Sequence, residues 1–279
     1  MERANCERGC IVKKVAIFLI MLGVIGMALT AKSFFTREKV DSELNFSGER
    51  FEHVVVEGGQ GNVQILPSTS NDIEVSWKGS LFNRGSRDDV VRVEENDSEL
   101  KINIGKQRFF NISFFNFDFL NRLEVRIYMP EKQFKSLVVK SEIGNVNIKD
   151  VHVDHLTAET DVANMTIESV HTKSTVVETD VGNVTLENIE GKLHGESDVG
   201  NITIRNEEIT NDMTFLSDVG KIELIVPRIP DNITFDADSS IGTVKVFGER
   251  GSYISNEAEH IVSMFTDIGN ITVRAARGQ

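Results

Sequence analysis

Carboxylate side chains recur at a nearly fixed interval in the C-terminal half of the chain, and such a row could hold divalent cations. They occupy the second position of a short string whose copies include TDVGNVTL, SDVGNITI and SDVGKIEL. If copies stack about 4.8 Å apart, neighbouring carboxylates repel one another, and Ca²⁺ ions would relieve that repulsion. The column consists of Glu142, Asp161, Asp180, Asp198, Asp218 and Asp267, with Ser240 as the exception.

Each copy of the string offers only one carboxylate, which argues against a calcium row. Solenoids that bind calcium through a Gly-Gly-x-Gly-x-Asp string use a nine-residue repeat with several carbonyl ligands, and the period here is twice as long. We therefore expect each Asp to accept hydrogen bonds from backbone N–H groups at a turn. The calcium row stays open as the alternative.

A second group that could bind metal combines imidazole and carboxylate side chains. His152 and His171 each follow the Gly or Ala of their copy by eight residues, and Glu190 takes the same place in the next copy. Three neighbouring copies would then present ligands of the kind that zinc prefers. A fourth ligand is not evident, so a surface ladder without metal is the simpler interpretation.

The first position of the string is always Ser or Thr, and a serine hydroxyl can act as a nucleophile. A nucleophile needs an adjacent base and an orienting acid, and nothing in the sequence distinguishes one hydroxyl from its copies. We expect the column to face inward and to form hydrogen bonds along the stack. It comprises Ser141, Thr160, Thr179, Ser197, Ser217, Ser239 and Thr266. We predict no catalytic residues, no cofactor and no enzymatic activity.

The spacing of the copies predicts the elements that position these side chains. Seven copies begin at residues 141, 160, 179, 197, 217, 239 and 266, so the period is close to 19 residues and lengthens toward the C-terminus. In one copy Ser197 and Val199 share a parity, as do Ile202 and Ile204, which indicates two short strands with one buried side each. Such units bury their apolar sides only by stacking. The sequence therefore predicts an all-β fold, a parallel β-solenoid of the β-helix kind.

A bend must separate the two strands of each copy. Val199 and Ile202 are three residues apart, so both face inward only if the backbone turns at Gly200 and Asn201, residue types that tolerate positive φ. We expect Asp198 to point outward at this corner. The predicted turn glycines are Gly144, Gly182, Gly200, Gly220, Gly242 and Gly269.

The domain organisation follows from a hydrophobic run near the N-terminus. Residues 15–31 carry no charge, and a helix of this length is about 25 Å long, the low end for crossing a bilayer. We predict a cytoplasmic segment over 1–14, a transmembrane anchor over 15–31, a linker over 32–44 and the solenoid over 45–275. A cleaved signal peptide is the alternative, because the residues that end at Ala28 have the small-x-small form of a cleavage site.

The expected solenoid has an irregular part, residues 45–140, and a regular part, residues 141–275. Residues 90–105 have the pattern of a hairpin. Residues 108–122 contain six phenylalanines, which we expect to cap the open end of the stack; a contact surface for a partner or membrane is the alternative. Three prolines are expected to end strands, namely Pro67, Pro130 and Pro227.

Charge is unevenly distributed along the chain. Residues 1–40 hold 7 Lys and Arg against 3 Asp and Glu, which leaves 23 against 40 in residues 41–279. A domain this acidic is a poor partner for nucleic acid, whose phosphates require a basic surface. Both cysteines, Cys6 and Cys10, precede the hydrophobic run, so no disulfide can stabilise the predicted solenoid.

These features resemble the bacterial putative-adhesin family, a domain of unknown function found in LiaG-type envelope proteins. The resemblance covers roughly residues 45–275 and rests on the N-terminal hydrophobic anchor, the SDVGNITI strings and the segment IYMPEKQFKSLVVKSEIGNVNI. It implies a β-solenoid outside the bacterial membrane, in some cases linked to envelope-stress operons, and it supplies no catalytic residues.

We therefore expect a non-enzymatic, single-pass protein of the cell membrane, anchored by residues 15–31, with its large domain extracytoplasmic. Its expected role is binding or scaffolding at the envelope, in adhesion or stress sensing, with an envelope protein or a glycan as partner. One alternative is a structural polymer that self-associates through an exposed C-terminal strand edge at NITVRAARGQ. Another is a polysaccharide-active β-helix enzyme, which would need an acid, base or metal cluster outside the repeat.

Overall fold

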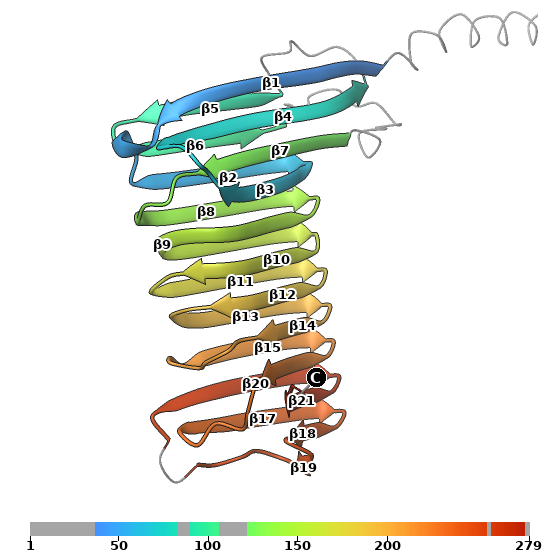
Figure 1. Ribbon diagram of the computed structural model, residues 1–279. Coiled ribbons are helices and arrows are strands. Elements are labelled where there is room, and N and C mark those ends of the chain that lie inside the picture. Colours follow the sequence, from blue (N-terminus) through green and yellow to red (C-terminus); the bar gives the residue numbers. More distant parts are fainter. Residues whose placement is uncertain (1–36, 83–89, 106–121, 256–257, 277–279) are drawn as a thin grey trace, which may run out of the picture.

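The computed structural model describes residues 37–82, 90–105, 122–255 and 258–276. Over these ranges the chain is a tall all-β stack, with one three-residue 3-10 helix, η1 (Gly48–Arg50) (Figure 1). The described residues contain no helix that is long and apolar enough to cross a membrane. The predicted anchor, residues 15–31, lies outside the described residues.

Two sheets line the stack, and most copies of the repeat contribute one strand to each. Sheet A contains, in spatial order, β1 (Arg37–Ser47), β4 (Asp72–Phe82), β7 (Arg122–Met129), β3 (Asn62–Pro67), β9 (Val146–Val162), β10 (Met165–His171), β12 (Val184–Ile189), β14 (Ile202–Arg205), β16 (Ile222–Val226), β21 (Ile271–Ala275), β18 (Val244–Val246) and β19 (Glu249–Arg250). Sheet B contains β5 (Val91–Asn96), β6 (Glu99–Ile104), β2 (His53–Gln60), β8 (Phe134–Ile143), β9 again, β11 (Ser174–Val181), β13 (Lys192–Val199), β15 (Met213–Val219), β20 (His260–Ile268) and β17 (Ile233–Ile241).

The regular part pairs in parallel, so equivalent positions of successive copies form columns. Met165 lies opposite Val184, and Val184 lies opposite Ile202, on three successive strands of sheet A. The long strand β9 belongs to both sheets, because it pairs with β10 through its first half and with β11 through its second half. The predicted all-β, parallel-rich solenoid is confirmed over the described residues.

At the two ends of the stack, the spatial order of the strands differs from their order in the sequence. Strand β20 pairs with β15 on one side and with β17 on the other, and β21 lies likewise between β16 and β18. The last strands of the chain are thus interior, and the expectation of an exposed edge at NITVRAARGQ is wrong. The outer strands β17 and β18 are followed by the hairpin of β18 with β19 and by a single antiparallel bridge from Phe235 to Tyr253.

The N-terminal end is also rearranged. Strands β2 and β3 pair with β8 and β9, while β6 and β7, which come later in the chain than β2 and β3, lie outside them. Strands β5 and β6 form the predicted antiparallel hairpin. Strand β1 begins at Arg37 and pairs antiparallel with β4, so it starts inside the stretch expected to be a linker. Residues 106–121, which hold the six phenylalanines, lie outside the described residues.

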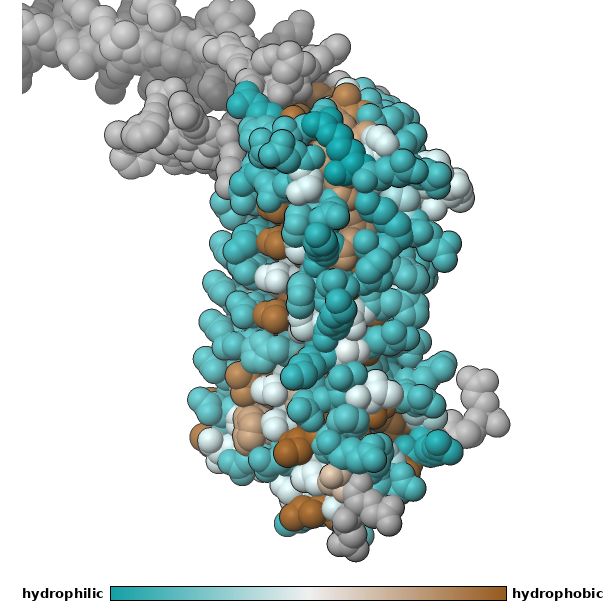
Figure 2. Space-filling view, turned by 90° about the vertical axis from the view of Figure 1, so that its left-hand side faces the viewer, coloured by the Kyte–Doolittle hydropathy of each residue, from teal (hydrophilic) through white to brown (hydrophobic). Residues whose placement is uncertain are grey.

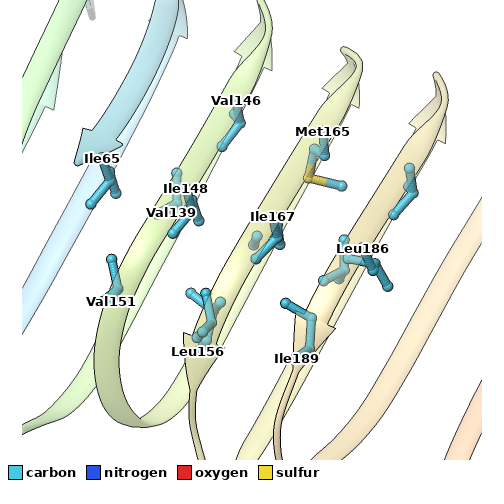
Figure 3. Close-up of a cluster of buried hydrophobic side chains, with 14 of the residues drawn as sticks. Ile65, Val139, Val146, Ile148, Val151, Leu156, Met165, Ile167, Leu186 and Ile189 are labelled. Atoms are coloured by element: carbon cyan, nitrogen blue, oxygen red, sulfur yellow. The ribbon is translucent and has the colours of Figure 1, made fainter. Parts of the chain in front are cut away.

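The core is a continuous column of branched apolar side chains between the two sheets (Figure 3). Ile148, Met165, Ile167 and Leu186 come from successive strands of sheet A and are fully buried. Each such side chain contributes about 1.5–3 kcal/mol when it leaves water. The three prolines stand at strand exits as predicted, since Pro67 ends β3 and the other two follow β7 and β16.

Candidate binding edge

The corner between the paired strands of each copy does not bury the residues that the sequence pattern predicts. Ser197 is fully buried and Ile202 and Ile204 are buried, as expected, but 48% of Val199 is exposed. The inward and outward alternation of β13 stops after Ser197, where the paired register with β11 skips Asp198, and both Asp198 and Val199 are exposed. The prediction of Val199 as a core residue is therefore wrong.

Every regular copy repeats this exposure, which produces a column of β-branched apolar side chains in water. Strand register places the members opposite one another on successive rungs, with Val199 between Val181 and Val219. Their exposed fractions lie between 43% and 66%. In spatial order the column is Ile143, Val162, Val181, Val199, Val219, Ile268 and Ile241.

The acidic column runs directly beside the apolar column, one residue earlier in each copy, and its side chains point outward as predicted. Asp161, Asp180, Asp198, Asp218 and Asp267 are exposed. The expectation that these carboxylates accept hydrogen bonds from the corner backbone is wrong: within the described ranges, the five have neither a hydrogen-bond nor an ion-pair partner. The calcium row stays an untested alternative.

Asparagine provides the corner hydrogen bonds that were expected from aspartate. Asn183 accepts a bond at Oδ1 from the backbone N of Asn201 at 3.0 Å and another from its Nδ2 at 3.1 Å. Asn164 does the same for Asn183, with distances of 3.0 and 3.1 Å. Lys221 interrupts the ladder, but its backbone N still donates to Asn201 Oδ1 at 2.9 Å. Where a copy has this asparagine, its side chain thus fixes the spacing to the next rung at the corner.

Glycine is required at Gly200 and Gly220 mainly because the rungs approach closely there, whereas Ala163 carries a Cβ at the equivalent position of its own copy. A Cβ on Gly200 would collide with the carbonyl oxygen of Gly182, and one on Gly220 with that of Gly200. Gly144 and Gly182 have φ of +133° and +158°, whereas Gly200 and Gly220 are not among the positive-φ glycines. The predicted turn residues are therefore correct in position, but the positive-φ explanation applies to only part of the column.

The Ser and Thr column faces inward as predicted, with Ser239 half-buried at the end of the stack. One pair bonds along the stack, from Thr160 Oγ1 to Thr179 Oγ1 at 3.0 Å. The next hydroxyls instead donate to a glycine carbonyl of the neighbouring rung, as Ser197 does to Gly182 at 3.3 Å. The bonded hydroxyls stabilise the corner from within, whereas the buried Ser141 Oγ has no hydrogen-bond partner among the described residues.

We call the apolar and acidic columns together the corner edge. In Figure 1 it lies on the right, where the arrowheads of β11 and β13 end. An exposed apolar run bordered by polar groups marks interaction surfaces, and the unpaired carboxylates give this edge a negative field. Seven rungs at about 4.8 Å make it about 30 Å long. The sequence shows seven apolar residues at a fixed place in the repeat. Each stands two positions after a Ser or Thr that faces inward, so simple strand alternation predicted that the apolar residue would be buried as well.

The opposite edge of the stack carries the predicted histidine ladder. His152 and His171 lie side by side with ring centroids 4.5 Å apart, and His171 Nδ1 is 2.9 Å from Glu190 Oε1. The structure therefore brings the three residues together on adjacent rungs. Metal binding by this ladder stays an untested alternative.

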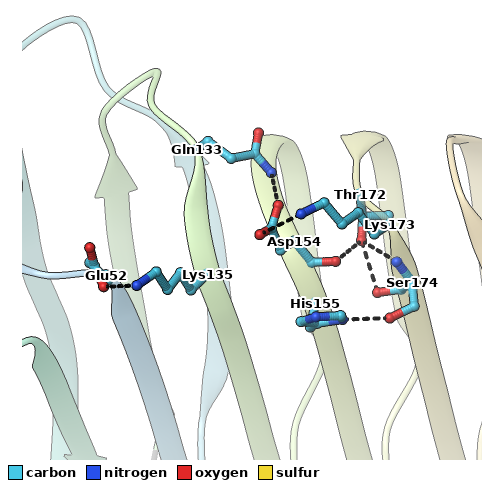
Figure 4. A network of polar contacts seen from close by, with 8 residues as sticks. All are labelled: Glu52, Gln133, Lys135, Asp154, His155, Thr172, Lys173 and Ser174. Carbon is cyan, nitrogen blue, oxygen red and sulfur yellow. Dashed lines mark hydrogen bonds and ion pairs between the residues drawn. The ribbon is translucent and has the colours of Figure 1, made fainter.

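Hydrophilic residues cover most of this opposite edge (Figure 2). Asp154 accepts bonds from Gln133 Nε2 at 3.0 Å and from Lys173 Nζ at 2.9 Å (Figure 4). The hydrogen bond from Lys173 is the main reason that the pKa of Asp154 lies below its usual value. His171 and Glu190 line an open hollow of about 690 Å³ near these groups. Ion pairs satisfy much of the charge here, in contrast with the corner edge.

Comparison with known proteins identifies a family that this chain matches. Residues 51–274 match the family described as Toastrack DUF4097. The search of curated proteins found no match.

Several solved structures of bacterial proteins also resemble this chain. One is a putative cell adhesion protein from Clostridium sporogenes, with 13% identity, a TM-score of 0.39, and coverage of 86% of this chain and 100% of that one. A putative adhesin from Bacteroides fragilis has 15% identity, a TM-score of 0.45, and coverage of 86% and 98%. A putative lipid binding protein from Parabacteroides distasonis has 10% identity, a TM-score of 0.43, and coverage of 86% and 97%.

Proposed function

The chain belongs to the Toastrack DUF4097 family, and from that premise we propose that it is a non-enzymatic binding protein of the bacterial cell envelope. The corner edge is its binding surface. The partner is an envelope polypeptide that presents apolar side chains next to lysines or arginines. One observation carries the proposal: seven exposed Val and Ile side chains stand in register beside a column of carboxylates without partners.

The chemistry of the corner edge favours a polypeptide over a glycan. Its apolar column consists of valine and isoleucine, which offer neither hydrogen bonds nor aromatic faces to a sugar. Branched aliphatic side chains bind other apolar side chains by removing them from water. The carboxylates beside them would set orientation and encounter rate through charge complementarity with a basic partner. An edge about 30 Å long matches a partner helix of about 20 residues or a shorter extended segment.

The membrane location of the proposal is supported by the hydrophobic run at residues 15–31 and the basic residues that flank it. In this arrangement the solenoid stands outside the membrane and displays the corner edge at a distance from the bilayer. The intact mass of the protein extracted from membranes tests the anchor. A mass that retains residues 1–31 supports it, and a mass that begins after Ala28 shows a cleaved signal peptide instead.

Site-directed photo-crosslinking in cells tests the corner edge. A photoreactive residue replaces Val199 in the full-length protein, and in a matched variant it replaces Lys173 on the opposite edge, whose side chain is 71% exposed. We expect a discrete protein adduct from position 199 and none of that mass from position 173. Charge reversal through Asp180→Lys and Asp198→Lys should remove the adduct, because a basic partner is then repelled.

Two results would contradict the proposal. Equal adducts from both positions would indicate contacts without a specific surface. An adduct that survives the double charge reversal, with its mass unchanged, would show that the acidic column takes no part in recognition. The same assay on a variant that lacks residues 1–31 tests the anchor separately from the corner edge. Loss of the adduct only in that variant would concern the anchor, and loss through charge reversal would concern the edge.

A further inference from the structure

We propose that Glu178, His194 and Glu196 form a binding site for a divalent transition-metal ion of the Zn²⁺ class. The site lies on the outer face of sheet B, where Glu178 and Glu196 stand two residues before Asp180 and Asp198 of the corner edge. One ligand atom from each of the three side chains lies within 4.8 Å of the other two. His194 Nε2 and Glu196 Oε2 are 3.6 Å apart, close to the separation of about 3.3 Å between two ligands of a tetrahedral zinc ion.

Rigid strand geometry holds the three side chains in place. His194 and Glu196 are two residues apart on β13, so they project from the same face of the strand. Glu178 lies on β11 directly opposite Glu196 in the parallel register. Closing separations of up to 4.8 Å to about 3.3 Å is an adjustment of up to about 1.5 Å, within the range of side-chain rotation.

Charge balance on the two sheets sets this site apart from other surface carboxylates. On sheet A, Glu168 and Glu187 are neighbours on successive strands. Each of them has a cation on its far side: Lys149 Nζ is 3.0 Å from Glu168 Oε2, and Arg205 Nη1 is 2.6 Å from Glu187 Oε1. The two carboxylates of that ladder are therefore matched by two cations.

The corresponding ladder on sheet B lacks the second cation. Lys140 Nζ pairs with Glu159 Oε2 at 2.6 Å, and Glu178 and Glu196 follow Glu159 on successive strands. On the other side of Lys140, Glu57 has its own cation, Lys101, at 3.0 Å. The next residue of the column is Leu216. In the described part of the chain, Glu178 has no lysine or arginine within hydrogen-bond or ion-pair distance, and Glu196 has only His194. A bound divalent cation would supply the charge that Arg205 supplies on sheet A.

The ligand set favours zinc over calcium. Imidazole nitrogens and carboxylate oxygens are common zinc ligands, whereas calcium binds six to eight oxygen ligands and rarely binds imidazole. Glu178 is exposed, and His194 and Glu196 are half-buried, so a fourth position stays open to solvent for water or a group from a partner. Zinc and copper bind such a nitrogen and oxygen set better than manganese or calcium.

Isothermal titration calorimetry of the full-length, untagged protein with ZnCl₂ tests the site. We expect one zinc ion per chain at this site, with an affinity that falls at least tenfold in His194→Gln and in Glu178→Gln. The matched control is His171→Gln, which removes another exposed histidine that lies beside a glutamate, and it should leave the affinity unchanged. All three positions are on the surface, so thermal melts of the apo variants should coincide with that of the unchanged protein.

The same titrations define the outcomes that overturn the inference. Zinc binding that survives His194→Gln but is lost in His171→Gln assigns the metal to the other ladder. Several weak sites that respond to neither variant show general attraction to an acidic surface, and an absence of binding heat together with an unchanged melting temperature in ZnCl₂ shows no site. A calcium titration that saturates at the same stoichiometry and is lost in His194→Gln would contradict the choice of metal.

Discussion

The side-chain amide of Asn206 forms two hydrogen bonds with the backbone of Ile189, bonds that a neighbouring strand's backbone would otherwise supply. Its Nδ2 donates to the carbonyl oxygen of Ile189 at 2.9 Å, and its Oδ1 accepts from the backbone N of Ile189 at 3.1 Å. Asn206 is only 4% exposed and directly follows β14, where the chain leaves the regular ladder. One side chain thus extends the hydrogen bonding between β12 and β14 beyond their last paired residues, Glu187 and Arg205.

Replacement of this amide should be costly. Asn206→Ala leaves a buried N–H and a buried C=O of Ile189 without partners, so we expect the free energy of unfolding to fall by about 2–3 kcal/mol. Asn206→Asp retains only the acceptor and should also destabilise the protein. Urea denaturation measures both. The control is Asn211→Ala, which removes an exposed bond to Thr210 and should cost less than about 0.5 kcal/mol; equal costs at the two positions would contradict the prediction.

The close approach of the rungs predicts the effect of a methyl group at the corner. Gly200→Ala places a Cβ against the carbonyl oxygen of Gly182, and the rungs must separate to admit it. We expect a loss of more than about 2 kcal/mol in the free energy of unfolding. Ala163 occupies the same position in its own copy, so Ala163→Gly serves as the control and should cost about 1 kcal/mol or less. Comparable melting temperatures for Gly200→Ala and the unchanged protein would show that the corner is more open than the structure indicates.

Glu223 predicts a pH dependence of stability. Lys221 Nζ at 2.7 Å and Arg274 Nε at 2.8 Å hydrogen-bond to its carboxylate, and these bonds hold the pKa of Glu223 below its usual value. A carboxylate whose pKa is lower in the folded state stabilises the fold above its unfolded pKa, near 4.3, and loses that contribution as the pH falls through the folded pKa. The contribution should be about 1 kcal/mol or less for a partly exposed pair.

The measurement compares Glu223→Gln with the unchanged protein in urea at several pH values. The difference in the free energy of unfolding should be largest above about pH 5 and should shrink as the pH falls through the folded pKa. Glu207→Gln changes an exposed glutamate and should show no such trend. A difference for Glu223→Gln that stays constant across this range would mean that the carboxylate's charge does not stabilise the fold.

Because the apolar column is exposed, we predict that its valines tolerate substitution by polar residues with little loss of stability. Val199→Ser removes a branched side chain from a strand end, yet nearly half of that residue already contacts water, so the free energy of unfolding should change by less than about 0.5 kcal/mol. Ile202→Ala, three residues later and fully buried, should cost about 2–5 kcal/mol. Thermal and urea denaturation check both. A loss of several kcal/mol in the free energy of unfolding of Val199→Ser would contradict the prediction and indicate that this side chain is buried.

Much of the stack could be predicted because its repeat is regular. Parallel pairing in register turns a period near 19 residues into columns of equivalent side chains, so Ser197, Asp198 and Gly200 identify the positions of their copies on other rungs. The burial of Ile202 and Ile204 also follows from simple alternation. The hairpin at residues 90–105 and the strand ends at the prolines depend on local backbone rules, and local rules are visible in a sequence.

The corner could not be predicted in the same way, because its hydrogen bonds and contacts join different rungs. Whether Asp198 or Asn201 accepts the backbone bond depends on where the neighbouring rung places its N–H groups. The need for glycine at position 200 comes from a carbonyl group 18 residues earlier in the chain. Likewise, the cluster of Glu178 with His194 and Glu196 spans two strands and has no signature along one of them.

The sequence by itself determined the all-β class, the repeat, the columns and most of the core, since these depend on period and alternation. Only the tertiary structure decided that Val199 and its equivalents face water, because the strand's alternation is interrupted at the preceding aspartate while the sequence pattern continues unchanged. It also decided that β20 and β21 lie inside β17 and β18. The chain between residues 246 and 260 is long enough to return past a rung, and pairing on both sides gives β20 and β21 hydrogen bonds that an edge position would leave unpaired.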